Sequence, residues 1–105
     1  MNIKQKLGLK IKEIRKSKNY TQEFVAESIG IETKSLSNIE RGIFYPTSDN
    51  LEKISNVLEV SPQELFNFEH FKSDEELKEE ITQIIEANPK KIKEIYKLIK
   101  AIITD

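Results

Sequence analysis

The spacing of apolar residues between Gln22 and Arg41 constrains the fold of this chain more than any other feature. The apolar positions in this segment are Val25, Ala26, Ile29, Ile31, Leu36 and Ile39. Gly30 follows the first three, and a residue without a Cβ adopts a left-handed conformation at little steric cost. The pattern therefore predicts two short helices, Gln22 to Ile29 and Thr33 to about Arg41, which meet across a tight turn at Gly30.

Helical periodicity continues on both sides of this pair. The apolar positions that carry it are Ile3, Leu7, Ile11 and Ile14 before the pair, and Leu51, Ile54, Val57, Leu58, Leu65 and Phe66 after it. Ser61 and Pro62 form an N-cap and a first-turn proline, which open the last short helix. No segment alternates as a strand would. We therefore expect an all-α domain of five helices over residues 1–67.

Two amphipathic helices are expected after a linker at residues 68–72. Ser73 begins the first, and Asn88-Pro89 separates it from the second. Their apolar stripes are Leu77, Ile81, Ile84 and Ile85, then Ile92, Ile95, Tyr96, Ile99, Ile102 and Ile103. We expect residues 73–105 to form a C-terminal helical hairpin. Its surplus apolar surface predicts homodimerisation through these residues, with docking on the chain's own N-terminal domain as the alternative.

Composition excludes several classes of protein. The chain has no cysteine and one histidine, His70, so we expect no disulfide, no metal site and no cofactor. No nucleophile–base pair or phosphate-cradling glycine loop can be assembled, and we expect a binding protein rather than an enzyme. The N-terminal residues offer neither a signal-peptide core nor a membrane span, which predicts a cytoplasmic protein without a membrane partner.

The charge is distributed unevenly, although the formal net charge is only −1. Residues 1–20 hold seven basic side chains and one acidic one, whereas residues 46–70 hold five acidic side chains and one basic one. The second helix of the central pair also has a polar outward face, made of Thr33, Lys34, Ser37, Asn38 and Arg41. A donor-rich face on a short helix suits the major groove of double-stranded DNA, which is wide enough to admit one helix.

The same segment resembles the helix-turn-helix of Cro/repressor-type transcriptional regulators, the XRE family. The matching residues are Thr21-Gln22-Glu23-Phe24-Val25-Ala26, Gly30-Ile31 and Leu36-Ser37-Asn38-Ile39-Glu40-Arg41-Gly42. Matches extend upstream to Ile11-Lys12-Glu13-Ile14-Arg15 and downstream to Tyr45-Pro46, Leu51, Ile54 and Val60-Ser61-Pro62-Gln63-Glu64-Leu65. The resemblance covers about residues 7–66. It implies a repressor with a lambda-repressor-like domain that binds a two-fold related operator.

The resemblance also implies roles for individual residues. Base contacts are expected from Thr33, Lys34 and Asn38, and phosphate contacts from Thr21, Gln22, Ser35, Arg41 and Tyr45. Arg15 and Glu40 match positions that pair across the domain, which implies a structural ion pair. Glu32 departs from the family, whose members often have a small hydroxyl residue there.

An alternative function is an antitoxin or controller-type protein whose C-terminal helices bind a protein partner.

Overall fold

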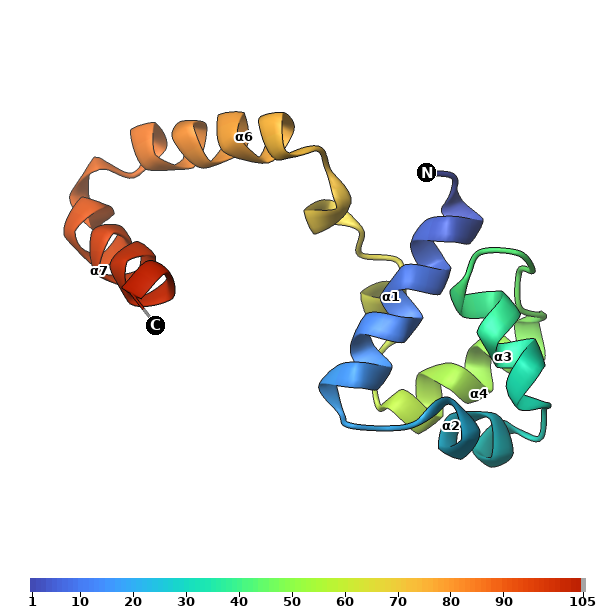
Figure 1. Ribbon diagram of the computed structural model, residues 1–105. Helices are drawn as coiled ribbons and strands as arrows, with labels where there is room; N and C mark the ends of the chain where they lie inside the picture. Colours follow the sequence, from blue (N-terminus) through green and yellow to red (C-terminus); the bar gives the residue numbers. More distant parts are fainter. Residues whose placement is uncertain (105) are drawn as a thin grey trace. The chain divides into compact units, whose positions relative to one another are not determined.

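The computed structural model describes residues 1–104, and all regular structure in this range is helical (Figure 1). The α-helices are α1 (Ile3–Ser17), α2 (Gln22–Ile29), α3 (Thr33–Glu40), α4 (Ser48–Leu58), α5 (Pro62–Leu65), α6 (Asp74–Ala87) and α7 (Ile92–Thr104). Two 3-10 helices, η1 (Glu69–Phe71) and η2 (Pro89–Lys91), precede α6 and α7. The predicted all-α fold is confirmed. None of these helices is both long and apolar enough to cross a membrane.

The chain divides into two compact units, Met1–Glu69 and a second that begins at His70. The division falls within the segment 68–72, which the sequence suggested as a linker. That segment is not wholly irregular, because η1 (Glu69–Phe71) occupies three of its residues. The two units are described separately below.

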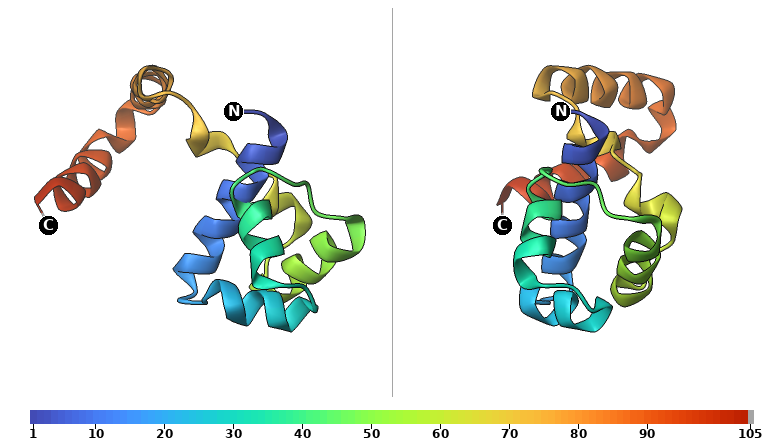
Figure 2. Two further views of the ribbon diagram at one scale, coloured as in Figure 1. Left: turned by 45° about the vertical axis from the view of Figure 1, so that its right-hand side comes forward. Right: turned by 90° about the vertical axis from the view of Figure 1, so that its right-hand side faces the viewer.

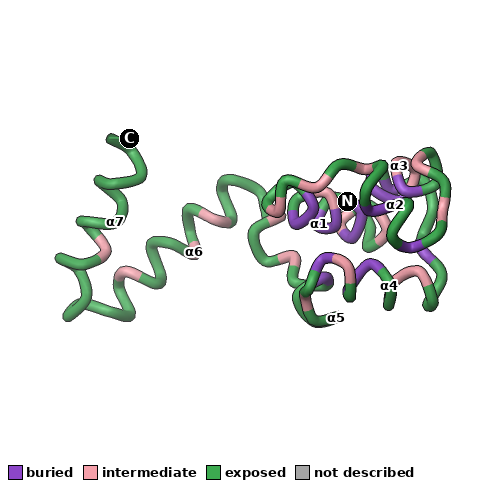
Figure 3. Tube along the Cα trace, turned by 90° about the horizontal axis from the view of Figure 1, so that it is seen from below, coloured by how far each residue is buried: buried purple, intermediate pink, exposed green. Residues whose placement is uncertain are grey.

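The first unit contains the hydrophobic core. Its buried apolar residues are Leu7, Ile11, Ile14, Val25, Ala26, Ile29, Leu36, Ile39, Ile54, Leu58 and Leu65. Every one of these was expected from helical periodicity, and Figure 3 shows that the buried segments are confined to the first unit. Ile31, Leu51 and Val57 are partly buried against this core. Two other expected core residues are exposed, Ile3 at 60% and Phe66 at 38%. Ile3 is the first residue of α1 and Phe66 is the C-cap of α5, so both lie at helix ends.

Helices α1 and α3 pack side by side (Figure 2), and their backbones approach closely at Gly8. A Cβ at this position would contact the carbonyl oxygens of Ile39 and Glu40, the second of them at 2.7 Å. The glycine is therefore required by the packing of two backbones, whereas a glycine inside a helix ordinarily weakens it. Helix α2 packs on α3 and α4, and α5 packs on α1 and α4.

The second unit contains α6 and α7, joined by a hydrogen-bonded corner. The Asn88 amide nitrogen Nδ2 donates to the Ile84 carbonyl at 2.8 Å, and the Lys91 backbone nitrogen donates to the Asn88 carbonyl at 3.0 Å. The two expected C-terminal helices are present. They lie at an angle around this corner rather than packing along their lengths as a closed hairpin does (Figures 1 and 2).

Candidate nucleic-acid interface

The turn between α2 and α3 has the conformation that the sequence predicted. Gly30 is left-handed, with φ 76° and ψ 31°, and its backbone nitrogen donates to the carbonyls of the last turn of α2. The Ile31 backbone nitrogen donates to the Ala26 carbonyl at 3.0 Å. These bonds close the end of α2 and allow α3 to begin three residues after Gly30.

The N-termini of the two helices are capped differently. The Thr21 hydroxyl accepts a hydrogen bond from the Phe24 backbone nitrogen at 3.0 Å, so this residue is the N-cap of α2. Glu32 is the N-cap of α3, and its side chain makes no capping hydrogen bond. Glutamate carries its carboxylate one methylene further out than aspartate. The first backbone nitrogens of α3 therefore lack the side-chain acceptor that serine, threonine or aspartate provides.

Helix α3 separates buried from solvent-facing residues. Its buried residues are Leu36, Ile39 and Glu40, while Lys34 is exposed and Thr33 and Asn38 are partly exposed. At 100° per residue, the three predicted base-contacting side chains fall within an arc of about 140° on the opposite side from Leu36 and Ile39. The structure thus gathers Thr33, Lys34 and Asn38 on one accessible face.

The predicted phosphate-contacting residues lie around this face. Thr21, Ser35, Arg41 and Tyr45 are exposed, and Gln22 is partly buried. The loop that carries Tyr45 is attached to α3, because the Ile43 backbone nitrogen donates to the Asn38 carbonyl at 2.9 Å. Gly42 begins this loop with φ 74°, and a Cβ there would lie 2.8 Å from the Gln5 Cα. The loop is therefore fitted against α1 as well as α3.

Arg15 and Glu40 form a buried bidentate ion pair between α1 and α3. Arg15 Nε lies 2.7 Å from Glu40 Oε2, and its Nη2 donates to Oε1 at 3.0 Å. The side chains are 8% and 1% exposed, respectively. A third bond runs from Arg15 Nη1 to the Tyr20 carbonyl at 2.8 Å. The pair therefore fixes the end of α3 against α1 and the segment that leads into α2.

Gln22 belongs to the same cluster, which sequence reasoning missed. Its Nε2 donates to Glu40 Oε1 at 3.0 Å, so the first residue of α2 is attached to the last residue of α3. The amide nitrogen carries two hydrogens, and this bond uses one of them. Contacts of this kind join residues 18 positions apart and have no local sequence signal.

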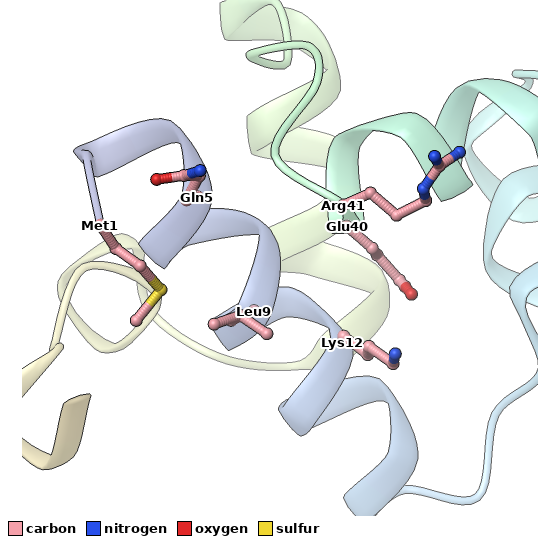
Figure 4. Close-up of a pocket in the computed structure, with 6 residues that line it drawn as sticks. All are labelled: Met1, Gln5, Leu9, Lys12, Glu40 and Arg41. Atoms are coloured by element: carbon pink, nitrogen blue, oxygen red, sulfur yellow. The ribbon is translucent and has the colours of Figure 1, made fainter.

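An open groove of about 440 Å³ lies between α1 and the end of α3. It is lined by Met1, Gln5, Leu9, Lys12, Glu40 and Arg41. Figure 4 shows the cationic ends of Lys12 and Arg41 projecting away from Met1. Lys12 of α1 and Arg41 at the C-terminal end of α3 thus add positive charge along this groove, and positive charge attracts a phosphate backbone.

Comparison with known proteins supports this interpretation. Residues 11–65 match the family described as Helix-turn-helix. The control protein C.BamHI of Bacillus amyloliquefaciens is 41% identical over 68 residues, which cover 64% of this chain and 84% of that protein. The crystal structure of the restriction-modification controller protein C.AhdI from Aeromonas hydrophila aligns with a TM-score of 0.57 and 31% identity, over 59% of this chain and 94% of the other.

A third similarity extends into the C-terminal helices. The structure of a complex of SinR and SinI proteins aligns with a TM-score of 0.58 and 30% identity, and covers 94% of this chain and 99% of the matched chain. The fold and the α2–α3 pair define a lambda-repressor-like DNA-binding domain. The chain belongs to the XRE-type helix-turn-helix family, and it is a DNA-binding transcriptional regulator of that family.

Proposed function

We propose that this regulator is a cytoplasmic repressor that inserts α3 into the major groove of a two-fold related operator and binds it as a homodimer. The single observation that carries the proposal is the rigid support of α3. Its apolar side is anchored in the core, its last residue is held by Arg15 and Gln22, and its polar side remains accessible. A firmly held recognition helix is what discrimination between base edges requires.

In this proposal, discrimination between bases comes from contacts made by Thr33, Lys34 and Asn38. Lysine can donate to guanine O6 and N7, and the asparagine amide can pair bidentately with adenine N6 and N7. Contacts to phosphates belong to Thr21, Gln22, Ser35, Arg41 and Tyr45, which surround the helix. Such contacts set position and orientation on the duplex without reading sequence.

Dimerisation belongs to the apolar residues of α6 and α7, from Leu77 to Ile103. Every described residue of these two helices is at least partly exposed, and an apolar surface of this extent marks an interaction site. Two chains related by a two-fold axis present two recognition helices, which accounts for an operator with two-fold symmetry.

A controller-type or antitoxin function, in which the C-terminal helices bind a different protein, is the second candidate. It is favoured by the similarity to a SinR–SinI complex, which reaches beyond the DNA-binding unit. The two candidates assign different partners to α6 and α7, a second copy of this chain in the first and a different protein in the second. A chain that dimerises alone and binds a symmetric duplex supports the first.

The recognition model is tested by alanine variants at two kinds of position. Lys34→Ala and Asn38→Ala are expected to cost about 1 to 3 kcal/mol on the selected operator and little on a scrambled duplex. Arg41→Ala is expected to weaken binding to both duplexes and to reduce the slope of log affinity against log salt by about one. Lys53→Ala is the matched control, because it removes one exposed lysine from α4 instead of α3.

Competition titrations against both duplexes at two salt concentrations measure the affinity of each variant and its salt dependence. The operator itself comes from in-vitro selection with the full chain. Equal losses on the operator and the scrambled duplex for both Lys34→Ala and Asn38→Ala would overturn the assignment of α3 as the recognition helix. A loss for Lys53→Ala as large as that for Lys34→Ala would do the same.

A further inference from the structure

The apolar stripes of α6 and α7 are both uncovered. No residue of either helix is buried, and Ile81 and Ile84 of α6 are 52% and 51% exposed. On α7, Ile102 and Ile103 are 77% and 71% exposed. Each helix thus presents a row of large apolar side chains to water, at a cost of roughly 25 cal/mol for every Å² that a partner could cover.

Within one chain, the two stripes cannot cover each other in this arrangement. An antiparallel helical pair needs a loop that reverses the chain, usually two to five residues long. Here four residues, 88–91, join α6 to α7, but three of them form η2 rather than a reversing loop, and α6 and α7 each contact η2 without an extensive contact between them. Pro89 fixes its own φ, and the bonds to Ile84 and from Lys91 hold the corner open.

The charges of the two helices are opposite. The residues of α6 include six acidic side chains and one basic one, whereas η2 and α7 together include five lysines and one glutamate. At 100° per residue, Glu80 borders one edge of the stripe of α6, with Glu76 one turn before it, and Lys78 borders the other edge. Lys93 and Lys100 lie along one edge of the stripe of α7. A pair of α6 helices or a pair of α7 helices would bring like charges together, and α6 against α7 would bring opposite charges together.

We propose that α6 of one chain packs against α7 of a second copy, and α7 of the first against α6 of the second. The inference rests on the proposed homodimer and specifies its pairing. The helices match in length, at about 21 Å for α6 and about 20 Å for α7 at 1.5 Å per residue. Because each chain supplies one α6 and one α7, a two-fold axis repeats the α6–α7 contact and closes the assembly at two chains.

An anionic membrane surface is the competing occupant for α7, since a basic amphipathic helix also suits lipid headgroups. It leaves the stripe of α6 exposed, and it brings the acidic side chains of α6 toward a surface of the same sign. A second copy of the chain covers both apolar stripes and places the acidic side chains of α6 beside the basic side chains of α7. The observations therefore favour the second copy.

The test exchanges charge between the helices of the full chain. The α6 variant is Glu76→Lys with Glu80→Lys, and the α7 variant is Lys93→Glu with Lys100→Glu. The matched control is Glu79→Lys with Glu86→Lys, which makes the same charge change on the side of α6 away from its stripe. Circular dichroism checks that helicity is kept, and sedimentation equilibrium measures the dimer dissociation constant.

We expect each border variant alone to raise the dissociation constant by roughly tenfold or more, because like charges then face each other at both contacts. The control should change it much less. An equimolar mixture of the two border variants, and a single chain with all four substitutions, should both dimerise about as tightly as the native protein.

Three outcomes overturn the proposal. Border variants that dimerise as tightly as the native chain, with a mixture that is tighter still, would show that α6 pairs with α6 and α7 with α7. A native chain that is monomeric and cosediments with phosphatidylserine-containing vesicles would assign α7 to a membrane surface. A dimer that is insensitive to all of these charges would exclude the helix pairing while leaving the proposed homodimer intact. Binding of each variant to a duplex with one half-site reports separately on the DNA-binding unit.

Discussion

Glu40 connects three helices because its two carboxylate oxygens accept hydrogen bonds from both Arg15 and Gln22. A buried pair of this kind contributes modestly compared with a well-packed apolar substitute, but loss of one partner leaves a charge without compensation. The cluster holds the last residue of α3, the helix that presents the accessible face. Stability and DNA binding should therefore be affected together by changes at this position.

Substitution Glu40→Gln is expected to lower the free energy of unfolding by about 3 kcal/mol, because the Arg15 guanidinium loses its buried counter-charge. Thermal and urea unfolding followed by circular dichroism measure it. The double variant Arg15→Met with Glu40→Leu is the control, and it should be less destabilised than Glu40→Gln because it buries no charge. An unchanged midpoint for Glu40→Gln would contradict the role given to the pair.

Gly8 is the second position where one residue decides how helices meet. Alanine has a higher helix propensity by about 1 kcal/mol, so local preference favours Gly8→Ala. The new Cβ would press on the backbone of α3, which cannot move as a side chain can. We expect the clash to prevail, with a net destabilisation of about 2 kcal/mol or more.

The control for this variant is Gly30→Ala. No atom lies within 4 Å of a Cβ at position 30, so this change adds only the strain of a positive φ, about 1 kcal/mol. Urea unfolding of both variants supplies the comparison. Gly8→Ala with native or greater stability would mean that α1 and α3 can separate without cost.

These residues differ in how far the sequence could predict them. Arg15 and Glu40 were expected to pair because the resemblance places them at facing positions. The bond from Gln22 and the close approach at Gly8 were not expected, because both depend on where distant backbones meet. By itself, a glycine inside an amphipathic helix disfavours the helix. Only the packed structure shows that the close approach of α1 and α3 requires it.

At the scale of helices, most helix termini follow from residues that cap a helix locally. Thr21, Thr47, Ser61 and Ser73 each cap a helix through a side-chain oxygen. Gly30 ends α2 in the predicted left-handed conformation. The end of α4 was less predictable, because its left-handed cap is Glu59, a residue type that rarely adopts positive φ. The open corner between α6 and α7 was also missed, since Asn-Pro signals a helix break without giving its angle.

The unfilled cap of α3 leads to a prediction about Glu32. Glu32→Asp should raise the free energy of unfolding by about 0.5 to 1 kcal/mol, because the shorter side chain can accept from the first turn while it keeps its charge. Glu32→Ser should give a similar gain. It should also strengthen binding to any duplex, because it removes a carboxylate from the edge of the recognition helix.

The two variants therefore separate capping from electrostatics. Urea unfolding measures the first effect, and titration of a scrambled duplex at two salt concentrations measures the second. If Glu32→Ser and Glu32→Asp bind the scrambled duplex equally, the carboxylate lies too far from the phosphates to matter. If neither gains stability, the N-terminal turn of α3 is satisfied by other means.

On the scale of the whole chain, the hydrophobic core and the uncovered apolar stripes lie in different units. Every buried apolar residue lies between Leu7 and Leu65, and none lies in α6 or α7. The sequence predicted this separation through its two patterns, a compact series of short helices followed by two stripes without an evident partner. It could not predict the corner, which depends on hydrogen bonds around Asn88.

Deletion of all residues after Lys72 tests this division of roles. The remaining chain retains every residue of the core, so its thermal midpoint should stay within a few degrees of the native value at low protein concentration. It should sediment as a monomer and bind a duplex with one half-site as the native chain does. On a duplex with two half-sites its affinity should fall on the order of 100-fold, because the second half-site is no longer bound intramolecularly. A dimer that survives the deletion would move the dimer contact into the DNA-binding unit, and a truncated chain that unfolds would show that α6 and α7 contribute to its stability.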